Sequence, residues 1–237
     1  MKIMVINPNS SKEMTAHLDR VLQQIKGPDT ELTVTCPENG PLTIESAYDE
    51  AMCIPGVLPL VKKAEDDGYD AVILACFSDP GLEQAREISN ILVTGIEETS
   101  LHVAAMLGSK FTVLTMTDKR VPSKVSHVRR FKLENSLASV RPLGMSVAEI
   151  DADADRACKH ILEVARQAAE DDGAEVIVLG CAGMAGYAEM VRDELGMEVI
   201  DPSSVTLKVT EALLSVGLKQ SKRGLFSYPP CMRNCKK

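Results

Sequence analysis

The chain has 237 residues, of which 45% are hydrophobic and 25% charged, a composition typical of a globular protein with a substantial core. Its 34 acidic residues outnumber the 26 basic ones, giving a formal net charge of −8, and only 3% of the residues are aromatic. Nucleic-acid binding needs clustered positive charge or aromatic platforms, so we expect no nucleic-acid partner. The first apolar run is too short for a membrane span or a signal peptide, so we expect a cytoplasmic protein without a membrane partner.

Short apolar runs alternate with amphipathic stretches along the chain. The expected strands are residues 3–6, 71–75, 93–96, 111–116, 176–179 and 199–200. The expected helices are residues 12–25, 57–66, 82–89, 153–170, 188–195 and 204–214. This alternation predicts an α/β protein with parallel sheets flanked by helices.

An internal repeat is the most informative feature. Residues 64–68 (AEDDG) precede an apolar strand that ends at Cys76, and residues 169–173 (AEDDG) precede one that ends at Cys181. In both copies the cysteine follows the glycine by eight residues. The repeat predicts two similar lobes related by a pseudo-two-fold axis.

The lobe boundaries follow from the repeat. We expect an N-terminal lobe of residues 1–97 completed by about 205–225, a C-terminal lobe of residues 98–204, and a tail of residues 226–237. Ligands of open α/β sheets bind beyond the carboxyl ends of the strands, which is where each cysteine lies. Two lobes that face each other would bring the thiols together across a shared cleft, and we expect the active site there.

Two opposed thiols suit one kind of chemistry in particular. Inversion of a C–H centre needs one group that removes the proton from one face and another that delivers a proton to the other face. The glycine-rich and polar turns after Cys76 and Cys181 are typical of strand-to-helix turns, where backbone N–H groups favour a thiolate or an enolate-like oxygen. The alternatives are two small buried residues at strand ends or a redox pair, although no C-x-x-C motif is present.

The other cysteines and the histidines need no chemical role. Cys36, Cys53 and Cys158 are interpreted as packing or surface residues. Cys231 and Cys235 have half of a zinc spacing, but no other pair completes four ligands, so we expect no metal. We expect the four histidines to lie on the surface or in helix packing, and Glu97 to interact with a helix dipole.

Three motifs carry a resemblance to a known family: residues 7–10 (NPNS), 75–81 (ACFSDPG) and 180–184 (GCAGM). They resemble the hydantoin racemases of the aspartate/glutamate/hydantoin racemase superfamily, and the likeness covers nearly the whole chain. The segment 40–46 and Asp201-Pro202 match the same pattern. The resemblance implies a pseudo-two-fold α/β fold, a homo-oligomer, no pyridoxal phosphate or metal, and inversion at C5 of a 5-substituted hydantoin.

The resemblance also implies roles for individual residues. Cys76 and Cys181 would be the catalytic pair. Which of the two thiols removes the proton from which enantiomer stays open. The substrate-binding candidates are Asn7, Pro8, Ile44, Ser78, Asp79, Thr117, Gly183 and Met184. Asn7, Ser78 and Asp79 can equally be turn-capping residues. Many relatives have glycine at the position of Ser78, which leaves the preferred C5 substituent open.

Other substrates and functions stay open. Allantoin is itself a ureido-substituted hydantoin, and the sequence does not separate it from alkyl or aryl hydantoins. Amino-acid racemases of the superfamily have a histidine after the second cysteine and an acidic residue at the position of Asn7, and this chain has neither. More distant alternatives are double-bond isomerisation, decarboxylation with one cysteine, and a non-catalytic protein that binds a small cyclic amide.

Overall fold

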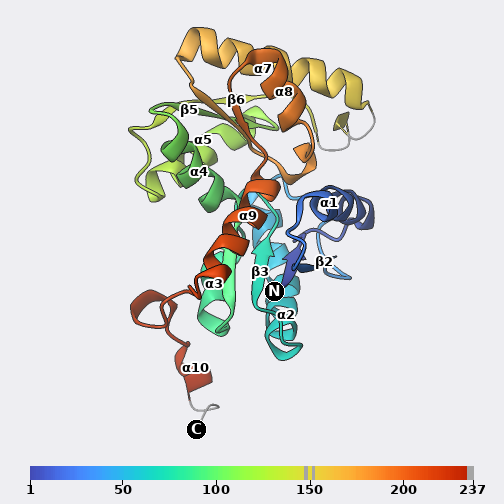
Figure 1. Cartoon of the computed structure of the whole chain (residues 1–237), viewed down its shortest axis with the longest axis vertical. Helices are drawn as coiled ribbons and strands as arrows, with labels where there is room; N and C mark the ends of the chain where they lie inside the picture. Colours follow the sequence, from blue (N-terminus) through green and yellow to red (C-terminus); the bar gives the residue numbers. More distant parts are fainter. Residues whose placement is uncertain (147–148, 151–152, 234–237) are drawn as a thin grey trace. The chain divides into compact units, whose positions relative to one another are not determined.

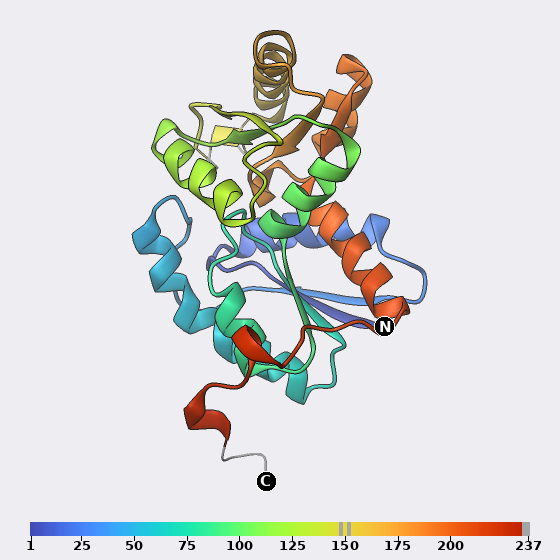
Figure 2. The same cartoon turned by 90° about the vertical axis from the view of Figure 1, so that its left-hand side faces the viewer.

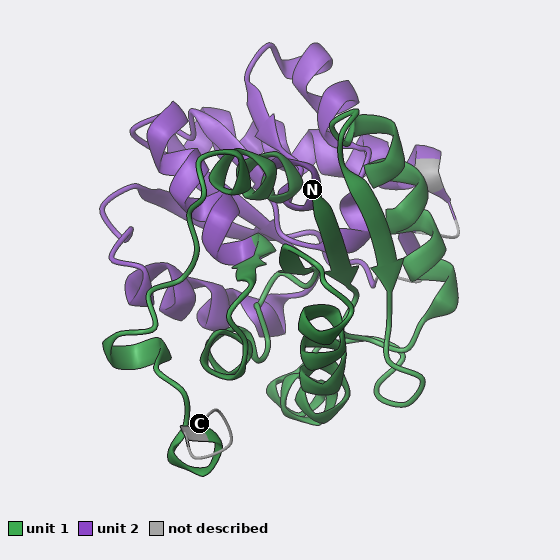
Figure 3. Ribbon diagram, turned by 60° about the horizontal axis from the view of Figure 1, so that its bottom comes forward, with its two compact units in different colours: residues 1–96, 206–237 green, residues 97–205 purple. Residues whose placement is uncertain are grey.

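The computed structural model describes residues 1–146, 149–150 and 153–233. Strands and helices alternate along the described chain (Figure 1). The contacts divide it into two compact units, residues 1–96 with 206–237 (unit 1) and residues 97–205 (unit 2), coloured separately in Figure 3.

Unit 1 contains a four-stranded parallel sheet. Its strand order is β2 (Glu31–Thr35), β1 (Lys2–Ile6), β3 (Ala71–Leu74) and β4 (Leu92–Gly95). The inner strand β3 is buried along its whole length, because helices cover parallel sheets on both faces. One face packs against α2 (Ala47–Asp66) and α3 (Leu82–Ile88), and α1 (Lys12–Ile25) contacts β2 (Figure 2).

Helix α2 begins ten residues earlier than the sequence predicted (Ala47 against residue 57), so the predicted start was wrong. Pro55 and Pro59 lie inside the helix, although proline lacks the N–H that an interior helical position donates. Ser46 nevertheless caps the first turn, because its side chain accepts a hydrogen bond from the Asp49 N–H at 3.2 Å. The helix runs through both prolines and buries one side against the sheet.

Unit 2 repeats the arrangement. Its parallel sheet has the order β6 (Leu137–Pro142), β5 (Phe111–Thr115), β7 (Val176–Leu179) and β8 (Glu198–Ile200), which corresponds to β2, β1, β3 and β4. Its helices are α4 (Ile96–Leu107), α5 (Val121–Arg130), α7 (Ala154–Asp172) and α8 (Ala188–Leu195). The predicted fold class is confirmed: two parallel sheets flanked by helices. The sequence did not predict β2, β6, α4 or α5, and Ile96 begins a helix rather than ending a strand.

The chain after α9 (Pro202–Ser215) belongs to unit 1 and contacts β4 and α3. The Gln220 side chain accepts a hydrogen bond from Val93 N–H and donates one to Val93 C=O, both at 2.7 Å, and so pairs with the edge strand β4. The Lys222 ammonium donates to three carbonyl groups at the end of α3. Two short helical turns follow, η3 (Gly224–Phe226) beside α3 and α10 (Pro230–Arg233), seen in red in Figure 2. Cys235 lies outside the described residues.

Candidate active site

Cys76 and Asn7 stand at neighbouring strand ends in unit 1. Asn7 and Pro8 follow β1, and Cys76 follows β3. Ile6 lies opposite Leu74 in the β1–β3 pair, so these two carboxyl ends share one edge of the sheet. Asn7 and Pro8 are buried and Cys76 is partly exposed. The structure therefore gathers these three residues at the edge where α/β sheets bind ligands.

The chain turns tightly after Cys76. The Cys76 carbonyl accepts hydrogen bonds from the N–H groups of Ser78 (2.8 Å) and Asp79 (2.9 Å). Asp79 adopts a φ of +47°, in the left-handed region that aspartate tolerates better than most residues. The Ser78 hydroxyl oxygen then lies 3.5 Å from the Cys76 sulfur, within reach of a hydrogen bond to sulfur.

The Asp79 side chain is directed along the sheet edge. It is 8% exposed, and its carboxylate packs on Gly95, the last residue of β4. A β-carbon at position 95 would overlap this carboxylate, so any larger residue there would have to displace the Asp79 side chain. Asp79 thus joins the Cys76 turn to the end of the neighbouring strand.

The Asn7 side chain shapes its own loop. Its amide nitrogen donates to Asn9 Oδ1 at 2.7 Å and to Thr15 Oγ1 at 3.0 Å. An amide nitrogen has two hydrogens to donate, and these two bonds use both. Asn7 therefore holds the loop that presents Pro8, which is the turn role that the sequence left open beside substrate binding.

Ile44 is half-buried in the segment that precedes α2. Ser10, in the loop after β1, holds this segment through two hydrogen bonds. Its N–H donates to Pro41 C=O at 2.9 Å, and its hydroxyl donates to Gly40 C=O at 3.1 Å. The segment that carries Ile44 is thus attached to the loop after β1.

Cys181 takes the corresponding place in unit 2. It begins the turn after β7, whose Leu179 lies opposite Leu114 of β5, while Thr117 follows β5 and is half-buried. Within the turn, Met184 N–H donates to the Cys181 carbonyl at 3.1 Å, and the Met184 side chain is fully buried. The four predicted residues of this unit therefore lie on two neighbouring strand ends or the turns after them.

Each of the two sulfurs has a hydrogen-bonding group two residues further along the chain. Cys76 has the Ser78 hydroxyl, and Cys181 has the Gly183 N–H, which donates to the sulfur at 3.4 Å. A donor directed at sulfur stabilises the charged thiolate relative to the thiol. The two units therefore present equivalent thiols, one with a side-chain partner and one with a backbone partner.

The remaining described cysteines differ from this pair. Cys36, Cys53 and Cys158 are buried, as the packing interpretation predicted, and Cys231 is exposed. Burial, followed by the charge of Glu50, raises the pKa of Cys53 to about 12. Burial also raises the pKa of Cys158. Thiols of this kind stay protonated near neutral pH and are poor bases or nucleophiles.

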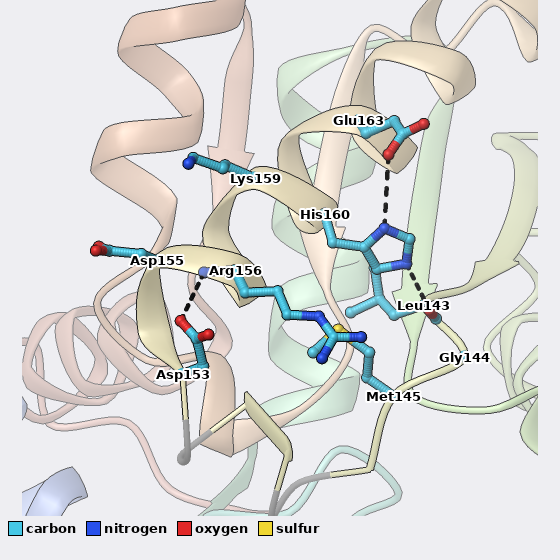
Figure 4. Close-up of a pocket in the computed structure, with 9 residues that line it drawn as sticks. All are labelled: Leu143, Gly144, Met145, Asp153, Asp155, Arg156, Lys159, His160 and Glu163. Atoms are coloured by element: carbon cyan, nitrogen blue, oxygen red, sulfur yellow. Dashed lines mark hydrogen bonds and ion pairs between the residues drawn. The ribbon is translucent and has the colours of Figure 1, made fainter.

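An open cavity of about 670 Å³ lies elsewhere in unit 2 (Figure 4). It is lined by the three residues that directly follow β6 and by the start of α7, including Arg156 and His160. The His160 ring is 2.6 Å from the Leu143 carbonyl oxygen, which matches the helix-packing role expected of the histidines. No predicted site residue lines this cavity. Among the described residues we find no cluster of His, Cys, Asp and Glu suited to a metal ion, and no helix long and apolar enough to cross a membrane.

A buried charged cluster in unit 2 was missed by the sequence analysis. Glu97 is 1% exposed, and its carboxylate accepts from the Lys124 ammonium at 2.9 Å and lies 2.7 Å from the His127 ring nitrogen. The sequence assigned Glu97 only a helix-dipole role. Burial alone would raise the pKa of Glu97, but Lys124 and His127 hold it below its ordinary value. The cluster joins the start of α4 to α5.

The fold and the paired thiols define a class: a duplicated α/β protein with one strand-end cysteine in each unit. The family model described as "Asp/Glu/Hydantoin racemase" matches residues 3–210, and the chain belongs to this family.

Relatives and solved structures agree with this assignment. The hydantoin racemase of Pseudomonas sp. (strain NS671) is 37% identical over 229 residues, which cover 97% of this chain and 92% of that protein. The hydantoin racemase of Paenarthrobacter aurescens is 34% identical over 230 residues, which cover 97% of this chain and 98% of that protein. A solved structure, the allantoin racemase from Klebsiella pneumoniae, aligns with a TM-score of 0.93 at 33% identity and covers 97% of this chain and 94% of that one.

Proposed function

We propose that the protein racemises 5-substituted hydantoins at C5, with Cys76 and Cys181 as the two acid–base groups. The observation that carries the proposal is the equivalence of the two cysteines: each follows the corresponding inner strand of its sheet and has a hydrogen-bonding group two residues later. The full-length similarity to proteins named hydantoin racemase and allantoin racemase supports it.

The proposed reaction removes the proton from one face of C5 and adds a proton to the opposite face. A thiolate on one side removes the C5 proton and becomes a thiol, and the electron pair of the C–H bond passes into the adjacent carbonyl to give an enolate. The opposite thiol then donates its proton to the other face and becomes the thiolate. The product is the mirror-image hydantoin, and the enzyme is left ready for the reverse direction. The balance needs no oxidant, metal or organic cofactor.

The other predicted residues would hold the ring at the strand ends and turns that carry the two thiols. Pro8, Ile44, Ser78 and Asp79 would contribute from unit 1, and Thr117, Gly183 and Met184 from unit 2, largely through backbone groups. Asn7 would act through the loop that it holds together. Assembly into a homo-oligomer and a cytoplasmic location stay predictions from the sequence.

Allantoin is the second candidate substrate, because one of the similar solved structures is an allantoin racemase. Amino-acid racemisation and ligand binding without catalysis are weaker alternatives. Allantoin carries a polar ureido group at C5, whereas alkyl and aryl hydantoins carry an apolar one. The same mechanism applies to both.

The direct test follows the optical rotation of a single-enantiomer 5-alkyl hydantoin and of allantoin in D2O, after subtraction of the spontaneous rate. The proposal expects rotation to decay to zero with deuterium at C5, and faster decay identifies the preferred ring. Binding without any decay of rotation would contradict the proposal and favour a binding protein. Decay only with free amino acids would favour the amino-acid racemase.

Ser78→Ala should lower kcat about tenfold, because a hydrogen bond to a charged group contributes roughly 1.5–3 kcal/mol. The Ser78 hydroxyl is the group 3.5 Å from the Cys76 sulfur, and its loss should move the thiolate limb of the kcat profile to higher pH. The measurement is kcat and KM against pH for each enantiomer. The exposed Ser215→Ala should leave the profile unchanged; an unaltered profile in Ser78→Ala would rule out this role.

A further inference from the structure

An aspartate outside the predicted site binds the turn that carries Cys181. Asp201 follows β8 and is 8% exposed. Its Oδ1 accepts from Ser203 N–H at 2.9 Å and Ser204 N–H at 3.1 Å, in the first turn of α9. Its Oδ2 accepts from Gly186 N–H at 2.9 Å. The two oxygens therefore hold two different segments, the start of a helix and the far end of the Cys181 turn.

The hydrogen bonds within the Cys181 turn stabilise its conformation only weakly. Its short helix η2 (Ala182–Met184) is a single turn of 3-10 type, whose hydrogen-bond geometry is poorer than that of an α-helix. Gly186 adopts a φ of +94°, a conformation that side-chain-bearing residues rarely adopt. The strand β7 fixes the near end of the turn, and the bond from Gly186 to Asp201 fixes the far end.

The burial of Asp201 indicates that both bonds matter. Burial raises the pKa of Asp201, and the N–H groups of Gly186, Ser204 and Ser203 act in the opposite direction. A buried carboxyl is costly unless its oxygens are hydrogen-bonded, and here each oxygen has a partner. A cap for α9 alone would need only one oxygen.

Unit 1 has an analogous connection between the turn after its cysteine (the thiol turn) and the end of the neighbouring strand. There the aspartate belongs to the thiol turn itself, and the Asp79 carboxylate packs on Gly95 at the end of β4. In unit 2 the aspartate follows β8 and reaches back to the thiol turn. Each unit thus joins its thiol turn to the end of the neighbouring strand through one aspartate.

We propose that Asp201 is a positioning residue for Cys181, an inference that rests on the proposed function of this thiol. By holding Gly186, Asp201 keeps the turn in the conformation that directs the Gly183 N–H at the Cys181 sulfur. Without this connection the turn relaxes, and the thiolate loses its backbone donor.

The test is the pH dependence of Cys181 labelling by iodoacetamide in Asp201→Asn, followed by peptide mass spectrometry. An amide has a single acceptor oxygen, so it can serve α9 or Gly186 but not both. The labelling midpoint should rise by about one pH unit, since a lost donor disfavours the reactive thiolate, and kcat should fall about tenfold. Removal of the negative charge by itself would lower the midpoint, so the direction separates the two effects.

Asp153→Asn is the matched control, because Asp153 caps α7 in the same unit by accepting from Arg156 N–H at 3.0 Å. It should leave the Cys181 midpoint unchanged. A second variant, Asp201→Ser, keeps a helix cap without the reach to Gly186 and should give the same upward shift. An unchanged or lowered midpoint in both Asp201 variants would overturn the inference. Labelling does not depend on turnover. A wild-type protein that fails to racemise hydantoins would therefore refute the proposed function, while the labelling midpoint of Cys181 would still test the positioning role of Asp201.

Discussion

Cys76→Ala and Cys181→Ala should each lower the racemisation rate by about a thousandfold, because positioned acid–base groups contribute roughly 10²–10⁴-fold. Inversion needs a base on one face of C5 and an acid on the other, so the loss of either thiol leaves one of the two proton transfers without its catalytic group. Substrate affinity should change far less than kcat, since alanine removes only one sulfur atom from each turn. The measurement is polarimetry with both enantiomers at pH 8.

Cys36→Ala is the matched control for this prediction. Cys36 directly follows β2, at the same edge of the unit 1 sheet as Cys76, and it is buried. It has no counterpart in the repeat, so its replacement should leave kcat within about twofold of the wild-type value. A Cys76 or Cys181 variant that retains wild-type kcat would exclude the two-thiol mechanism.

Lys124→Met should lower the free energy of unfolding by about 3–5 kcal/mol at pH 7, because it removes the cation from a buried ion pair. Lys124 is 3% exposed, and its replacement leaves the buried Glu97 carboxylate beside the His127 ring but without the ammonium. The double variant Glu97→Gln/Lys124→Met should recover most of this loss, since it buries no uncompensated charge. Denaturant unfolding followed by circular dichroism measures the effect.

The same pair predicts how acid affects stability. The pKa of Glu97 is lower in the folded protein than its ordinary value of 4.5, so the folded state binds the proton less readily than the unfolded chain does. The stabilisation is therefore complete above about pH 4.5 and is lost as the pH falls through the folded-state pKa. Lys62→Met, which breaks the partly exposed pair with Glu65, should cost at most about 1 kcal/mol. Equal losses in Lys62→Met and Lys124→Met would contradict the role of burial.

The repeat in the sequence predicted the fold class because it falls on the most regular elements. The inner strands β3 and β7 are buried on both faces and are almost purely aliphatic, so their pattern is unambiguous. The edge strands β2 and β6 are only half-buried and contain polar residues, so they lacked that signal. Helix α4 was missed because it follows Gly95 with no intervening turn, which hides the boundary.

The contacts around the predicted site depend on residues far apart in the chain. The cysteines were found because each ends a copy of the same strand. Glu97 and Lys124, in contrast, are 27 residues apart, and only the packing of α4 against α5 brings them together. Asp201 was noted as part of a motif, but its bond to Gly186 crosses from the end of β8 to the turn after β7. Periodicity carries no signal for such a contact.

Deuterium exchange at C5 in the single-cysteine variants tests the central claim most directly. With one thiol left, that thiol can still remove the C5 proton from its own face, exchange it for deuterium from D2O and return the deuterium to the same face without inversion. Cys76→Ala should therefore exchange one enantiomer of the hydantoin in D2O, and Cys181→Ala should exchange only the other, above the spontaneous rate. Exchange of the same enantiomer by both variants would contradict two thiols on opposite faces of the substrate.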